Sequence, residues 1–134
     1  MIVVDTNIIC YRWIPSSYSP DAEKALIKDA DWIAPLLWRS EFRNALAGAI
    51  RQNLITLAVA NDIADKAEWH FVNHEFVVSS RAVLDLIANS DCSAYDCEFV
   101  ALAHANGVRL LTVDRQVLRE FPEVAISLNK FVRD

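Results

Sequence analysis

Short apolar runs alternate along the chain with longer segments in which apolar positions recur every three or four residues. Short runs of this kind are typical of buried strands, and the longer periodic segments are typical of helices. The runs predict strands at Ile2–Val4, Asp31–Ala34, Phe76–Val78, Val108–Val113 and Val124–Ile126. The periodic segments predict helices at about Asn7–Trp13, Asp21–Asp29, Pro35–Gln52, Leu57–Asn73, Ser80–Asn89, Ala94–Asn106 and Arg115–Phe121.

Strands that alternate with helices indicate an α/β fold, a parallel sheet joined by right-handed crossovers and covered by helices. Pro35 suits the first position of the third helix, and Gly107 suits the position just after a helix end. The charged tail Lys130–Asp134 is expected to be exposed. No linker, repeat or low-complexity segment interrupts the pattern, so we expect residues 1–134 to form one domain.

Composition narrows the class of protein. The chain has only two glycines, which excludes the glycine-rich phosphate loops of nucleotide-binding proteins. No apolar stretch is long enough to span a membrane, and Asp5 interrupts the run at the start, so we expect neither a membrane span nor a signal peptide. Three cysteines cannot all pair with one another, which fits reduced thiols and a cytoplasmic location.

The charge balance sets a condition on any nucleic-acid partner. The formal net charge is −5, from 13 basic and 18 acidic residues. Proteins that bind nucleic acid through charge alone are usually basic. If this chain handles nucleic acid, a bound metal or a local basic patch must offset its negative charge.

Two carboxylates follow predicted strands. Asp5 comes directly after Ile2–Val4, and Asp114 comes directly after Val108–Val113. In a parallel sheet both would lie at the edge where open α/β sheets bind ligands. Asp96 lies in the first turn of a helix. Each also has a purely structural explanation, because aspartates cap helices and favour their first turns.

Glu41 is harder to explain structurally. It lies inside the predicted Pro35–Gln52 helix, and the positions four residues away are Leu37 and Ala45, so no basic residue pairs with it along the helix. Asn44 shares its face. A half-buried carboxylate without a partner is costly, and a metal ion shared by Glu41 with the three aspartates would be such a partner. Oxygen ligands of this kind select Mg²⁺ or Mn²⁺, either of which can activate water for attack on phosphorus.

Four segments together resemble the successive motifs of the PIN-domain ribonucleases, and among these the VapC-type toxins of toxin–antitoxin pairs. They are Asp5-Thr6-Asn7, Ser40–Ala45 (SEFRNA), Tyr95–Ala103 (YDCEFVALA) and Leu110–Asp114 (LLTVD). Each motif alone is weakly specific. The ordered set covers essentially the whole chain, with spacing similar to that of the family.

The resemblance implies a five-stranded parallel sheet flanked by helices and a hydrolytic endoribonuclease that uses Mg²⁺ or Mn²⁺. It implies that single-stranded or loop RNA is the substrate, that the toxin is a homodimer, and that a cognate antitoxin inserts a segment near the site. By the same resemblance, the acidic catalytic and metal-site residues are Asp5, Glu41, Asp96 and Asp114. The supporting residues are Thr6, Asn44 and Thr112. The alternative is a catalytically weak PIN-like module that binds protein or RNA.

Two other kinds of metal site are open from the sequence. Cys92, Cys97 and His104 would make a soft site without a fourth ligand, and packing of buried cysteines is the simpler explanation. His70 and His74 have the spacing of a metal pair, but no zinc-protease pattern surrounds them.

Two further interpretations concern phosphate chemistry. Arg43 and Arg115 are close in sequence to acidic residues and are the arginines best placed to contact RNA phosphates. A phosphatase of the haloacid-dehalogenase kind would use Asp5 as its nucleophile. That pattern needs a second aspartate two positions on, where this chain has Asn7.

Overall fold

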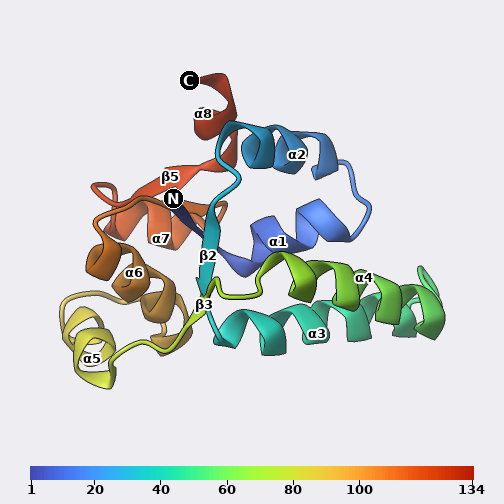
Figure 1. Ribbon diagram of the computed structural model, residues 1–134. Coiled ribbons are helices and arrows are strands. Elements are labelled where there is room, and N and C mark those ends of the chain that lie inside the picture. Colours follow the sequence, from blue (N-terminus) through green and yellow to red (C-terminus); the bar gives the residue numbers. More distant parts are fainter.

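Five parallel strands form the central sheet of the computed structural model, which describes residues 1–134 (Figure 1). The strand order is β3-β2-β1-β4-β5, and every neighbouring pair is parallel. This confirms the predicted α/β fold with a five-stranded parallel sheet. The strands are β1 (Ile2–Val4), β2 (Trp32–Pro35), β3 (Glu75–Phe76), β4 (Leu110–Thr112) and β5 (Ala125–Ser127).

β1 lies in the middle of the sheet and is buried on both faces. Val3 is paired with Ile33 of β2 on one side and with Leu110 of β4 on the other. Its continuous apolar sequence fits a central parallel strand, whose two faces are both covered by helices. Because β1 and β4 are neighbours and run in the same direction, the residues that follow them emerge at the same edge of the sheet.

Eight helices flank the sheet. They are α1 (Thr6–Trp13), α2 (Ser19–Lys28), α3 (Leu37–Arg51), α4 (Leu57–His70), α5 (Ser80–Ala88), α6 (Ala94–Asn106), α7 (Arg115–Glu120) and α8 (Leu128–Arg133). In Figure 1, α1 and α2 lie on one side of the strands, and α5 and α6 lie on the other. The long helices α3 and α4 run side by side and project away from the sheet.

The helices begin and end where local chemistry predicts. Asp5, Ser93 and Asp114 are the N-caps of α1, α6 and α7, and each side chain accepts a backbone N–H of the helix that it starts. Gly107 ends α6 with a φ of 62°, a left-handed conformation that glycine adopts without steric cost.

Two predictions about the elements are wrong, and one helix was not predicted. Pro35 does not start a helix: it is the last residue of β2, and α3 begins at Leu37. α4 ends at His70 rather than at Asn73, and residues 71–73 form the turn that follows, in which Asn73 adopts a positive φ of 64°. The charged residues of the tail, Lys130, Arg133 and Asp134, are exposed as predicted, but the tail belongs to a helix that was not predicted, α8, and Lys28 of α2 donates a hydrogen bond to the Phe131 carbonyl at 2.7 Å.

The core lies between the sheet and the helices. Its largest fully buried side chains include Trp32 on β2, Trp38 and Phe42 on α3, and Phe99 on α6. Trp38 and Phe42 anchor α3 in the core, which fixes the direction in which its polar residues project. None of the helices combines the length and the apolar character needed to cross a membrane.

Candidate active site

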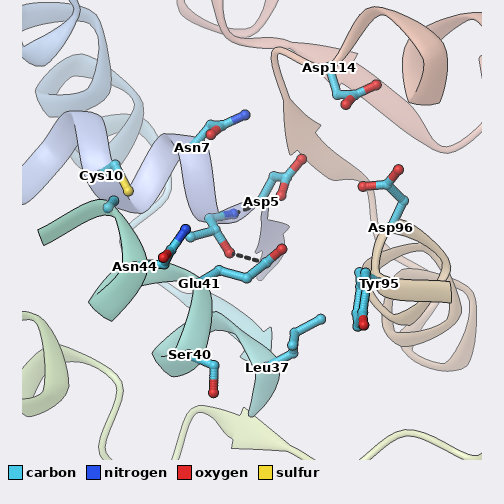
Figure 2. A pocket seen from close by; sticks show the side chains of 12 residues that line it. Asp5, Asn7, Cys10, Leu37, Ser40, Glu41, Asn44, Tyr95, Asp96 and Asp114 are labelled. Atoms are coloured by element: carbon cyan, nitrogen blue, oxygen red, sulfur yellow. Dashed lines mark hydrogen bonds between the residues drawn. The ribbon is translucent and has the colours of Figure 1, made fainter. Parts of the chain in front are cut away.

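A polar pocket of about 590 Å³ opens at the edge of the sheet where β1 and β4 end. Figure 2 shows its side chains: Asp5 lies near the centre, Glu41 on one side, and Asp96 and Asp114 on the other. These four carboxylates come from four different elements of the chain. All four residues that the sequence predicted for an acidic site therefore line the same pocket.

Asp5 is the most buried of the four, with only 9% of its surface exposed. Its two oxygens accept hydrogen bonds from the Thr6 backbone N–H at 2.8 Å and from the Thr112 hydroxyl at 2.7 Å. Burial raises the pKa of Asp5 to about 6, the two hydrogen bonds oppose the rise, and the charges of Glu41 and Asp96 add to it. The protein holds this carboxylate rigidly in a place where negative charge is unfavourable.

Glu41 projects into the pocket from α3 and is half-buried, as the sequence predicted. Its Oε1 accepts a hydrogen bond from the Thr6 hydroxyl at 2.7 Å. No ion pair involves Glu41, and Arg39, two residues away on the same helix, pairs with Glu68 at 2.7 Å and with Glu75 at 2.8 Å instead. Glu41 therefore keeps its charge free of any ion pair within the chain.

Asp96 and Asp114 face one another across the other side of the pocket. Burial raises the pKa of Asp96, and the charge of Asp114 raises it further. Asp114 accepts the Val117 N–H at 3.0 Å as the cap of α7, and its own backbone N–H donates to Thr112 Oγ1 at 3.0 Å. Thr112 thus connects the two strand-end aspartates through one hydroxyl.

No arginine, lysine or histidine is among the twelve residues that line the pocket. Burial is the largest cause of the raised pKa values of Asp5 and Asp96, and the neighbouring carboxylates raise them further, as expected where like charges lie close together without a cation. The donor chemistry, oxygen alone, suits Mg²⁺ or Mn²⁺. As the side chains stand, however, no three acidic, histidine or cysteine groups lie close enough together to hold one ion directly.

The supporting residues occupy two different positions. Thr6 and Asn44 line the pocket, whereas Thr112 is fully buried beneath it and acts on Asp5 and Asp114 from behind. Sequence reasoning did not select the other polar residues of the lining. Among these, Asn7 and Tyr95 lie next to predicted site residues in the sequence, and this proximity could have identified them.

Glu98 is a fifth acidic residue that the sequence analysis missed. Its pKa is raised, first by burial and then by the charge of Glu41, so it lies within electrostatic reach of the acidic pocket. It lines the adjoining apolar cavity rather than the pocket itself. Its proximity to Glu41 depends on how the fold places α6 relative to α3, which no local pattern reveals.

The other interpretations find little support in the geometry. Cys92 and Cys97 are buried and free, as the packing explanation expected, while His104 is exposed. Arg43 and Arg115 are exposed, and neither lines the pocket. The Cys10 thiol does line it, but burial raises its pKa to about 12, so it is a neutral thiol rather than a soft metal ligand.

Comparison with known proteins places this geometry in a family. Residues 2–125 match the model of the PIN domain. The chain is 28% identical over 125 residues to Ribonuclease VapC3 of Pyrobaculum aerophilum, an alignment that covers 90% of this chain and 95% of the relative. The crystal structure of PAE2754 from the same organism superposes with a TM-score of 0.77 at 20% identity, covering 98% of this chain and 86% of the other.

The family match and the fold agree with the motif order found in the sequence. The family model extends over nearly the whole chain and includes all four pocket carboxylates. The chain therefore belongs to the PIN-domain family.

Proposed function

We propose that this chain is a metal-dependent endoribonuclease that hydrolyses RNA phosphodiester bonds, and that it is the toxin of a type II toxin–antitoxin pair in the cytoplasm. Residues 1–134 would act as one catalytic domain. The observation that carries the proposal is the gathering of four carboxylates from four elements into one pocket without a cation. Membership of the PIN-domain family and similarity to a protein named Ribonuclease VapC3 support it.

Asp5, Glu41, Asp96 and Asp114 are the residues that would hold Mg²⁺ or Mn²⁺. Mg²⁺ keeps several of its waters when it binds protein, so one or two direct carboxylates, helped by contacts through water, are sufficient. This suits a pocket in which no three side chains are close enough to hold an ion directly. Once bound, the ion would offset the charges of the carboxylates and of the phosphodiester and activate water for hydrolysis.

The neighbouring residues have positioning roles in this proposal. Thr112 holds Asp5 and the backbone of Asp114 in place, and Thr6 does the same for Glu41 through its hydroxyl. Neither threonine is charged, so each holds a carboxylate in position without neutralising it. The carboxylates therefore keep their attraction for a cation. Asn44 and Asn7 line the pocket beside them and can donate to phosphate oxygens.

Two protein partners belong to the proposal. The similarity to Ribonuclease VapC3 suggests a cognate antitoxin, a separate chain that would bind near the acidic pocket. We also expect the chain to form a homodimer. RNA is the proposed substrate, and its approach to a chain of net charge −5 depends on the cation in the pocket.

The main alternative is a PIN-like module that binds protein or RNA with little catalytic activity. Four carboxylates gathered in one open pocket, three of them held by specific hydrogen bonds, argue against it, because a binding module does not need them. The haloacid-dehalogenase interpretation loses its basis, since the chain matches the PIN-domain model along nearly its whole length.

The test is cleavage of a structured RNA pool by the purified protein in Mg²⁺, Mn²⁺ or EDTA, beside the variants Asp96→Asn and Asp62→Asn. Asp62 lies on the exposed surface of α4, so its variant controls for loss of one negative charge. We expect metal-dependent cleavage by the wild type and by Asp62→Asn, and none by Asp96→Asn. Cleavage by Asp96→Asn at the wild-type rate would contradict the proposal. RNA and Mn²⁺ binding without any cleavage would favour the binding module.

A further inference from the structure

A second cavity, of about 570 Å³, lies between the end of α1 and the second half of α4, two helices that pack side by side (Figure 1). We call it the indole cavity. The residues that line it are Arg12, Trp13, Asp65, Lys66, Trp69 and His70. None of these side chains is aliphatic, and none lines the acidic pocket. The indole cavity therefore combines aromatic rings with charged groups at a place separate from the carboxylates.

Trp69 presents an open indole ring to this cavity. Its side chain is 80% exposed, whereas Trp32 and Trp38 are fully buried and Trp13 is half-buried. Trp13 is held in an aromatic cluster by contacts with Trp32 and His70, and Trp69 takes no part in this cluster. An indole face that is open to solvent on a helix is a platform on which another flat ring can stack.

Two cations beside this ring are weakly engaged within the chain. Lys66 lies one turn before Trp69, and its ion pair with Asp62 at 2.9 Å joins two exposed side chains, an arrangement that is worth little in water. The Arg12 Nε is buried without a hydrogen-bond partner, although it lies 2.8 Å from the Glu23 Oε2. Both cations can therefore turn to an anion that enters the cavity.

Helix α1 connects the indole cavity to the acidic pocket. Cys10 lines the acidic pocket, and Trp13, three residues further along the same helix, lines the indole cavity. Three residues correspond to ~4.5 Å along a helix axis. A strand of a few nucleotides that enters the acidic pocket can therefore continue along α1 into the indole cavity.

We propose that the indole cavity is a subsite for one unpaired nucleotide of single-stranded RNA, on the same strand that enters the acidic pocket. The base stacks on Trp69, and Lys66 and Arg12 bind the neighbouring phosphates. Asp65 is placed to accept a hydrogen bond from an amino group of the base. The subsite also supplies the local positive charge that a chain of net charge −5 needs in order to bind RNA.

The chemistry of the lining favours this occupant over others. Base-paired RNA keeps its bases stacked inside the helix, so the indole cavity selects single strands. The apolar face of a protein helix would need aliphatic walls, which the cavity lacks. The inference rests on the proposed function for the identity of the strand, but its test measures binding and does not depend on cleavage.

The test measures, by fluorescence anisotropy in EDTA, the binding of a short labelled RNA that cannot pair with itself. Trp69→Ala should weaken binding about 5- to 150-fold, the equivalent of one stacked base. Trp69→Phe keeps a flat ring and should retain most of the affinity. Leu54→Ala is the matched control, because Leu54 is 71% exposed but lies in the turn between α3 and α4, and its affinity should be unchanged.

Two further readouts separate stacking from phosphate binding. Lys66→Ala should reduce the slope of log affinity against log salt concentration by about 0.7, the value for one phosphate contact on a single strand, and Trp69→Ala should leave that slope unchanged. Lys130→Ala, which removes an exposed lysine from α8, should change neither affinity nor slope. RNA should quench the tryptophan fluorescence of the wild type, and Trp69→Phe should bind RNA with little of this quenching.

Circular dichroism checks that each variant is folded. A wild type that binds no RNA, or a Trp69→Ala variant that binds it as tightly as the wild type, would overturn the subsite and leave the cavity to a protein partner. A salt slope that Lys66→Ala does not change would overturn the phosphate contact. RNA binding through Trp69 by a protein that cleaves no RNA in Mg²⁺ or Mn²⁺ would support the subsite while contradicting the proposed nuclease.

Discussion

At the scale of single residues, the same aspartates have a structural role and a place in the acidic pocket. Asp5 caps α1 and Asp114 caps α7, so the structural explanation that each aspartate allows from sequence alone is correct. The same side chains also line the acidic pocket. A carboxylate oxygen can accept more than one interaction, so the capping role of these aspartates is compatible with a second role at the sheet edge.

The sequence identified some of the carboxylates in and near the pocket but not others. Glu41 was identifiable because no basic residue lies a helical turn away, and the structure shows that Arg39 is engaged elsewhere. Its contact with the Thr6 hydroxyl was not predictable, because it joins residues 35 positions apart on different helices. Glu98 was not predictable either, because its proximity to Glu41 joins two helices that are far apart in the sequence.

The pKa of Asp5 predicts how stability depends on pH in the absence of metal. Burial raises this pKa from 3.8 to about 6, so the folded state binds more protons than the unfolded state between these values. Protonated Asp5 therefore contributes up to about 3 kcal/mol to the free energy of unfolding. This contribution is present in full below about pH 4 and is lost as the pH rises through 6. In EDTA, the free energy of unfolding of the wild type should fall over this range more steeply than that of Asp5→Asn.

Urea unfolding at a series of pH values measures this difference. Asp96 and Glu98 also have raised pKa values and contribute slopes of the same sign to both proteins, so the difference between the two proteins isolates Asp5. Parallel pH profiles for wild type and variant would show that Asp5 titrates normally in the folded chain.

At the scale of elements, the pattern of the sequence predicted all five strands and seven of the eight helices. The errors have physical causes. Proline fits both the first turn of a helix and the end of a strand, so Pro35 was ambiguous. α8 was missed because its segment is only six residues long, too short to show a helical period. It is held by tertiary contacts, including the Lys28 hydrogen bond and the Lys28 ammonium stacked 4.7 Å from the Phe131 ring.

The two glycines make a matched test of backbone conformation. Gly107 has a φ of 62°, and a Cβ added there would meet no atom within 4 Å, so the cost of alanine is conformational alone. Gly107→Ala should destabilise the chain by ~1–2 kcal/mol. Gly48 lies inside α3 with equal space, and Gly48→Ala should stabilise the chain by ~0.5–1 kcal/mol.

Urea unfolding of both variants checks this pair. RNA cleavage should be unchanged in each, because neither glycine lines the pocket. A Gly107→Ala variant as stable as the wild type would mean that the end of α6 is not held in the left-handed conformation.

At the scale of the whole molecule, the strand order brings the site together. Sequence pattern alone implied that two strand-end aspartates share an edge of the sheet, because parallel strands end on the same side. The order β2-β1-β4 makes those strands direct neighbours, and this order is set by long-range pairing rather than by local pattern. The joint metal site itself stays a prediction.

Charge gives the molecule its clearest functional requirement. The chain has a net charge of −5, its pocket gathers four carboxylates, and the proposed substrate is also an anion. A divalent cation resolves this conflict, since it is attracted by both. The central claim is therefore that the pocket binds such a cation through these residues.

The most direct test is calorimetric titration of Mn²⁺ into the wild type, Glu41→Gln and the control Asp62→Asn, with no RNA present. We predict that the wild type and Asp62→Asn bind Mn²⁺ with the same affinity, and that Glu41→Gln binds about 10- to 100-fold more weakly, as expected when a group that holds the metal is altered. A wild type that does not bind Mn²⁺, or a Glu41→Gln variant that binds it equally well, would contradict the account.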